Sequence, residues 1–138
     1  MRVVIDTNSL LVSIGNQSRY RPIFDALISG KFTLVLSNDI LSEYREVLER
    51  RTTAFIADNI CDFLIQSPDV ERVNVHFKWN VIYIDKDDNK FVDCAMNGNV
   101  RMIVTDDKHF NVLKRVRFPG IKIMRTAAFL DLLTSNTL

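Results

Sequence analysis

Five short apolar runs divide this 138-residue chain, and each is too short to form a buried helix. They are rich in β-branched residues, which pack well on a pleated sheet. Continuous apolar runs of this length are typical of strands in a parallel sheet that is covered on both faces. The predicted strands are residues 1–5, 32–36, 81–84, 102–105 and 121–124.

The segments between these runs carry apolar residues at helical spacing. After the first strand we expect a loop and then a helix from Pro22 to Gly30, because proline favours the first turn of a helix. Thr126 is expected to cap the last helix. The remaining predicted helices span residues 39–50, 52–66, 88–97, 107–112 and 127–133. Strands that alternate with helices predict a single three-layer α/β/α domain over residues 1–138, with a mostly parallel central sheet.

Composition narrows the function classes. The hydrophobic fraction of 47% is sufficient for a sizeable core, and a net charge of +1 excludes the strongly basic surface of a protein that fills a DNA groove. Cys61 and Cys94 are isolated thiols in helical apolar patterns, which predicts reduced core residues instead of a disulfide or a zinc site. Because the first residues contain no apolar segment of secretory or membrane-spanning length, we expect a soluble cytoplasmic protein.

Three carboxylates follow predicted strands. Asp6 ends the first strand, Asp107 follows the strand 102–105, and Asp88 opens the helix after the strand 81–84. Ligand sites in parallel α/β sheets lie at the carboxyl ends of the strands, so these acids are expected at one edge. Glu43 can join them because it borders the apolar stripe of the helix 39–50, whereas Glu46 and Glu49 lie on its far side. A similar projection favours Asp88 over Asp93, which is kept in reserve.

Four acids brought together need a positive partner. Two like charges about 4 Å apart repel by about 4 kcal/mol at an effective dielectric constant of about 20. Hard divalent cations such as Mg²⁺ or Mn²⁺ prefer carboxylate and water oxygens, and the absence of predicted His or Cys neighbours counts against zinc. Metal ions held in this way activate water for attack on phosphorus, so phosphodiester hydrolysis is the expected reaction.

The motifs in this order resemble those of the PIN-domain nucleases, in particular the bacterial and archaeal branch of toxins from toxin–antitoxin systems. The resemblance covers essentially the whole chain. It is carried by Glu43 in the second helical region and by three motifs: Asp6-Thr7-Asn8, the segment from Asp88 to Ala95, and the segment from Val104 to Phe110.

This resemblance implies a Mg²⁺- or Mn²⁺-dependent endoribonuclease. Its acidic, metal-holding set would be Asp6, Glu43, Asp88 and Asp107, with Asn8 and Thr105 as supporting groups. It also implies an RNA substrate, an antitoxin protein that blocks the site, and homo-oligomers, in the simplest case dimers. Two features depart from the pattern. Asp106 stands beside Asp107 as a competing acid, and residues 71–80 match no motif that suggests how substrate is recognised.

Each candidate residue also has an ordinary structural explanation. Asp6, Asp88 and Asp107 can serve as turn or helix-capping residues, and Glu43 can pair with Arg50 or Arg51 at the surface. His109 is predicted to be a surface residue and not a general base, and His76 has no predicted role. Arg19 and Arg21 can contact a phosphate or simply face solvent. A basic rim beside the acids, or an ordinary exposed face, can be formed by Lys108, Lys114, Arg115 and Arg117.

Two other functions remain open from the sequence. The first is a PIN-like module that binds RNA or protein without cutting. The second is an α/β domain with an aspartyl phosphate, although Asp6-Thr7-Asn8 lacks the second acid of an Asp-x-Asp phosphatase motif.

Overall fold

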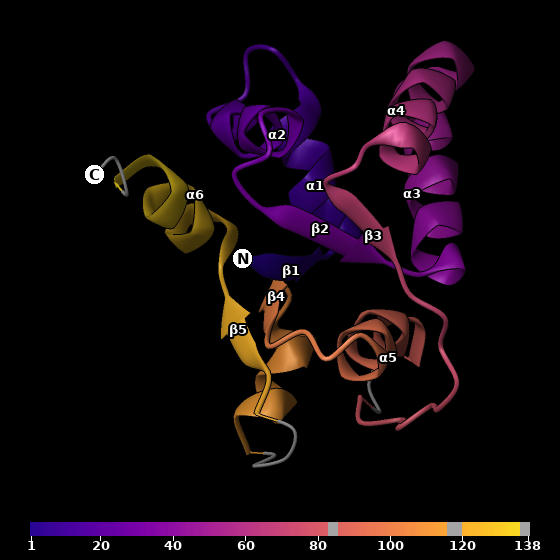
Figure 1. Ribbon diagram of the computed structural model, residues 1–138, viewed down its shortest axis with the longest axis vertical. Helices are drawn as coiled ribbons and strands as arrows, with labels where there is room; N and C mark the ends of the chain where they lie inside the picture. The colour runs from indigo at the N-terminus through magenta and orange to yellow at the C-terminus, as the bar shows by residue number, and fades with distance from the viewer. Residues whose placement is uncertain (83–85, 116–119, 136–138) are drawn as a thin grey trace.

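The computed structural model describes residues 1–82, 86–115 and 120–135 of the protein. Its centre is a five-stranded parallel sheet with the strand order β3-β2-β1-β4-β5 (Figure 1). The strands are β1 (Arg2–Ile5), β2 (Thr33–Leu36), β3 (Val70–Arg72), β4 (Met102–Val104) and β5 (Lys122–Met124). The sheet confirms the predicted α/β class and its parallel arrangement.

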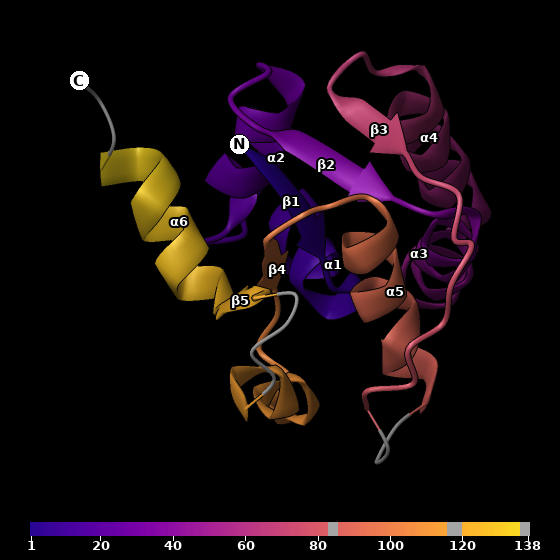
Figure 2. The same cartoon turned by 60° about the horizontal axis from the view of Figure 1, so that its bottom comes forward.

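The described residues form the α-helices α1 (Thr7–Ile14), α2 (Arg21–Ile28), α3 (Asn38–Arg51), α4 (Ala54–Gln66), α5 (Asn89–Asn97) and α6 (Thr126–Ser135). Two 3₁₀ segments, η1 (Lys86–Asp88) and η2 (Lys108–Arg115), precede α5 and follow β4. Helix α5 covers one face of β1, β2 and β4, whereas α1 and α2 lie behind the sheet (Figure 2). The result is the predicted three-layer sandwich.

The strand order explains where the layers change. From β1 through β2 to β3 the chain moves toward one edge, and it then crosses over to β4 on the other side of β1. Right-handed crossovers in opposite directions place their helices on opposite faces of the sheet. The order therefore reverses between β1 and β4, and a ligand site is expected at their carboxyl ends.

Three predictions about individual elements are wrong, and the first two concern α1 and the start of α6. Residues 7–14 form helix α1, where the sequence suggested a loop, and the amide of Leu10 donates to the carbonyl of Asp6 to close its first turn. This helix escaped prediction because it is short and contains serine and asparagine, which are weak helix formers. Thr126 is the first residue of α6 and not its cap, since its hydroxyl is bonded to Ser9 at 2.8 Å.

The third strand was also misplaced. Residues 81 and 82 belong to no strand, and residues 83 and 84, the rest of the predicted strand 81–84, lie outside the described residues. The strand that follows β2 in the sheet is Val70–Arg72, whose residues pair with Leu34, Val35 and Leu36. It is a three-residue edge strand with two charged residues, so it lacks the apolar run by which a central strand is predicted.

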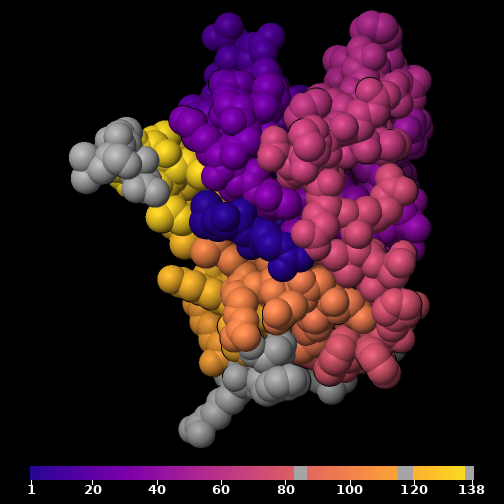
Figure 3. Space-filling model, viewed as in Figure 1, coloured from indigo at the N-terminus to yellow at the C-terminus, as the bar shows by residue number. Residues whose placement is uncertain are grey.

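Residues 73–82 form a strap that lies along α5 (Figure 3). Three polar side chains of α5, spaced four residues apart, bind the backbone of the strap. They are Asn89, Asp93 and Asn97. The Asn97 carbonyl oxygen accepts from the amides of His76 and Phe77 at 2.9 and 3.2 Å, and Asn89 exchanges two hydrogen bonds with Ile82. This strap accounts for most of the segment that matched no motif.

Both cysteines are buried free thiols, as the sequence predicted. Burial raises the pKa of Cys94 to about 12, so this thiol stays protonated and packs as an apolar core residue. Among the described residues, no helix has the length and apolar character needed to cross a membrane.

Candidate metal centre

The four predicted acids come from four separate elements that meet where the strand order reverses. Asp6 follows β1, Asp107 follows β4, Asp88 ends η1 at the start of α5, and Glu43 lies in the second turn of α3. Tyr44 fixes that helix against the sheet, because it is fully buried and its hydroxyl donates to the carbonyl of Ile5.

Asp6 is the buried member of the group, with 7% of its surface exposed. Burial raises its pKa from 3.8 to about 6, and the negative charges of Asp107 and Glu43 add to this rise. Hydrogen bonds oppose the shift, chiefly from the Thr105 hydroxyl, which donates to Asp6 Oδ2 at 2.8 Å. The same hydroxyl oxygen accepts from the amide of Asp107 at 3.0 Å. Thr105 thus links the strand-end acids and orients both.

Glu43 is held by two groups that the sequence analysis did not single out. The Thr7 hydroxyl donates to Glu43 Oε2, and the Lys90 ammonium lies 2.7 Å from Glu43 Oε1. The Lys90 and Glu43 side chains are 22% and 23% exposed, so their ion pair is partly shielded from water. Thr7 stands inside the Asp6-Thr7-Asn8 motif, and Lys90 follows Asp88 by two residues. Proximity to Asp6 and Asp88 in the sequence was the feature that could have identified Thr7 and Lys90 as site residues.

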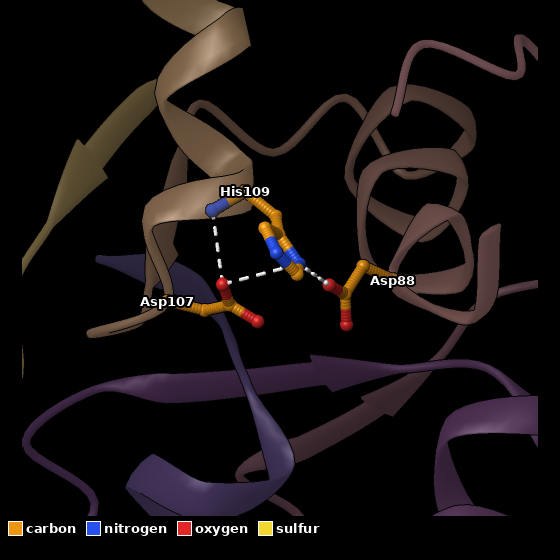
Figure 4. A group of neighbouring side chains, drawn as sticks. All are labelled: Asp88, Asp107 and His109. Atoms are coloured by element: carbon orange, nitrogen blue, oxygen red, sulfur yellow. Dashed lines mark hydrogen bonds and ion pairs between the residues drawn. The ribbon is translucent and has the colours of Figure 1, made fainter. Parts of the chain in front are cut away.

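Asp88, Asp107 and His109 form the tightest cluster of the site (Figure 4). The Nδ1 atom of His109 lies 3.3 Å from Asp88 Oδ2 and 3.4 Å from Asp107 Oδ1, and the ring stands between the two carboxylates. The backbone amide of His109 also donates to Asp107 Oδ1 at 2.9 Å. One potential ligand atom from each of the three residues lies within 4.8 Å of the others.

His109 therefore corrects two statements made from the sequence. It was expected to be an ordinary surface residue, yet its side chain is only 34% exposed and faces two of the acids. Zinc was disfavoured because no histidine was expected near the acids, and that premise is wrong. The residue was missed because the sequence shows only that it follows Asp107 by two positions, and not that η2 turns its ring toward α5.

The two competing acids have other partners. Asp106 Oδ1 accepts from the backbone amide of Thr126 at 2.9 Å, which satisfies the first turn of α6. Asp93 Oδ1 accepts from the amide of Trp79 in the strap at 2.9 Å, and burial raises the pKa of this carboxyl. Asn8 lies exposed in the first turn of α1, and its supporting role stays a prediction.

Basic side chains lie on one side of the acids. A depression of about 280 Å³ next to Asp107 is lined by Lys108, Lys114 and Arg125, together with Asn111. The Arg115 side chain and Arg117, the other members of the predicted rim, lie outside what the structure describes. Arg21, which was considered for phosphate contact, binds the Ile14 carbonyl and the Asn16 and Asp25 side chains, so it supports the loop before α2.

The donor set fits a divalent cation. It offers carboxylate oxygens from four elements and one imidazole nitrogen. The raised pKa of Asp6 reflects a carboxylate whose burial and neighbouring charges are not offset by cations, a cost that a bound metal ion removes.

Comparison with known proteins identifies the family. The sequence model described as PIN domain matches residues 2–109, which is most of the chain. The protein belongs to the PIN-domain family. No curated protein sequence matches the chain significantly.

Three solved structures of PIN proteins have a similar fold. VapBC2 from Rickettsia felis, bound to a DNA fragment from its promoter, matches with a TM-score of 0.63 and 16% identity, covering 91% of this chain and 98% of that one. VapC20 from Mycobacterium tuberculosis, a toxin that cleaves the sarcin–ricin loop, matches with a TM-score of 0.56 and 15% identity, covering 80% and 94%. The PIN domain endonuclease Utp24 matches with a TM-score of 0.52 and 23% identity, covering 90% and 84%. The chain thus has a VapC-like PIN fold.

Proposed function

We propose that this PIN domain is a metal-dependent endoribonuclease that hydrolyses RNA phosphodiester bonds at the acidic centre. Asp6, Glu43, Asp88 and Asp107 are the groups that hold a divalent ion, Mg²⁺ or Mn²⁺. The observation that carries the proposal is the convergence of these acids from four elements on the point where the strand order reverses. Family membership supports the same activity.

A divalent ion held by these acids would supply an activated water and stabilise the charge that develops on the phosphate oxygens. The chain's own residues position the ligands. Thr105 orients Asp6 and Asp107 through one hydroxyl, while Thr7 and Lys90 fix the two oxygens of Glu43. Rigid support of this kind keeps the ligands in place as charge changes during the reaction.

The basic depression gives the RNA backbone a place next to the centre. Lys108, Lys114 and Arg125 line it, and it shares Asp107 with the acidic group. A phosphate on one side of the scissile bond would lie against these cations, which position the strand without reading its sequence. The carboxylates by themselves would repel the polyanion, so the basic side chains offset that repulsion.

We further propose that the protein is the toxin of a toxin–antitoxin pair, acting in the cytoplasm. The VapC-like fold supports this role, since its matches include VapBC2 and the toxin VapC20. Its partners would be an antitoxin protein that covers the acidic centre and a second copy of the chain in a homodimer. Expression of the protein alone tests this part, because growth arrest is the expected result, and the proposed pair requires a small adjacent gene whose co-expression relieves that arrest.

Cleavage of single-stranded RNA in Mn²⁺ tests the nuclease proposal. Asp107→Asn should abolish cleavage because it removes a charged ligand, and Asp106→Asn is the matched control at the adjacent position. The control keeps an oxygen that accepts from the Thr126 amide, so its fold should persist. Asp106 also lines the basic depression, but the loss of a negative charge there does not weaken RNA binding, so the control should remain active. Equal activity of the two variants would refute the assignment of Asp107. RNA binding by the wild type without cleavage would instead indicate a binding module.

A further inference from the structure

His109 gives this centre a nitrogen donor among its oxygen donors. Its imidazole stands between Asp88 and Asp107, and Nδ1 lies 3.3 Å from Asp88 Oδ2 and 3.4 Å from Asp107 Oδ1 (Figure 4). The side chain is two-thirds buried, so the ring has little room to turn away.

The position of the ring is built into the fold. Its backbone amide is tied to Asp107 Oδ1, and the next residue, Phe110, is fully buried in the core. The Phe110 ring packs against Phe91 of α5 with 6.2 Å between the ring centroids. Segment η2 is thereby fixed against the helix whose start carries Asp88, and the imidazole is held at the junction.

The distances suit three ligands of one ion. Two adjacent ligand atoms of an octahedral ion with bonds of about 2.1 Å lie about 3.0 Å apart. The His109 Nδ1 atom lies 3.3 and 3.4 Å from the two carboxylate oxygens, a few tenths of an ångström more than this spacing. A small inward movement of each side chain would therefore place all three atoms around one cation.

Resting on the proposed function, we infer that His109 Nδ1 is a direct metal ligand, which makes the centre prefer transition-metal ions such as Mn²⁺ over Mg²⁺. Mg²⁺ favours oxygen ligands and keeps its water shell, whereas imidazole nitrogen binds first-row transition-metal ions better. An all-carboxylate centre would lack this source of discrimination. His109 would thus favour Mn²⁺ at a site where the acids alone accept either ion.

The chain offers matched variants for the test. His109→Asn places an amide group close to the position of Nδ1 and so exchanges a nitrogen ligand for an oxygen one. His76→Asn removes the other histidine of the sequence, which is exposed on the strap. Asp107→Asn reports whether the acids hold the ion at all.

Two measurements on the purified protein decide the question. Electron spin echo envelope modulation of bound Mn²⁺ should show a directly coordinated nitrogen in the wild type and in His76→Asn, and none in His109→Asn. Calorimetric titration should show that His109→Asn lowers the ratio of Mn²⁺ to Mg²⁺ affinity by about tenfold, while His76→Asn leaves the ratio unchanged.

Different results would refute the role of His109 and the role of the carboxylates. If Asp107→Asn abolishes Mn²⁺ binding but the wild type shows no nitrogen coupling and His109→Asn keeps the affinity ratio, the role of His109 is refuted while the carboxylate centre stands. If Asp107→Asn and the wild type bind Mn²⁺ equally, the acids do not hold the ion. The proposed function is then refuted together with the inference.

Discussion

Replacing Asp6 with asparagine should stabilise the metal-free protein while it abolishes cleavage. The pKa of Asp6 is raised from 3.8 to about 6, mainly by burial, so the folded state binds a proton more tightly than the unfolded state does. Keeping this carboxylate ionised in the fold costs free energy at neutral pH. An asparagine has nearly the same shape, retains an oxygen that accepts from Thr105, and carries no charge.

The pKa shift sets the magnitude and the pH window. A shift of about two units corresponds to about 3 kcal/mol, which is an upper limit for the gain because asparagine adds donors that need partners. The penalty is absent below pH 3.8, grows as the pH rises through this value to about 6, and is complete above about 6. Asp6→Asn should therefore exceed the wild type in stability at about pH 8 and match it at about pH 4.

Urea unfolding with a chelator present, followed by circular dichroism, measures this difference at each pH. In a thermal scan of the same samples, a gain of 1 kcal/mol in the free energy of unfolding would raise the melting temperature by roughly 3 °C in a domain of this size. Asp62→Asn, at an exposed carboxylate of α4, is the control and should follow the wild-type profile. Equal or lower stability of Asp6→Asn at about pH 8 would refute the claim that Asp6 is a strained, uncompensated anion.

Three further predictions concern the groups around the acids. Thr105→Val removes the hydroxyl shared by Asp6 and Asp107, so urea unfolding should show a loss of about 1–3 kcal/mol, and the acid limb of the pH–rate profile should move to higher pH; an unchanged profile would contradict this. Lys90→Gln removes the cation that fixes Glu43, so calorimetric titration should show weaker Mn²⁺ binding, whereas tighter binding would show that Lys90 competes with the ion for the carboxylate. Changing Lys108, Lys114 and Arg125 to glutamine should weaken RNA binding in fluorescence anisotropy and reduce its slope against log salt by about 2, at about 0.7 per phosphate contact. An unchanged slope would place the RNA elsewhere.

The positions of the acids in the fold could be predicted from the sequence because they follow from the topology of the sheet and the periodicity of a helix. A parallel sheet brings the residues after its strands to one edge, which placed Asp6 and Asp107 without knowledge of any side-chain contact. Helical periodicity then separated Glu43 from its neighbours on α3. The apolar strands are the clearest feature of the sequence, and their burial in the sheet places Asp6 and Asp107 at the site.

The partners of the acids could not be located in the same way. The contacts of Lys90 and His109 depend on how α5 and η2 are rotated against each other, and no periodicity in either short segment reports that rotation. Edge strand β3 has only three residues, two of them charged, so its position is set by pairing with β2. Asp93 looked like a reserve ligand until its bond to the strap backbone was visible.

The products formed at the scissile phosphate test most directly whether the acidic centre hydrolyses RNA with a metal-activated water. In the proposed reaction a divalent ion held by the four carboxylates would activate water, so cleavage of RNA in ¹⁸O-labelled water with Mn²⁺ should place one solvent oxygen in a terminal phosphate monoester. Mass spectrometry of the products should find that label and no 2′,3′-cyclic phosphate. A 2′,3′-cyclic phosphate would show that the neighbouring 2′-hydroxyl, and not water, attacks phosphorus. Cleavage that persists in the presence of a chelator would show that no metal ion is required.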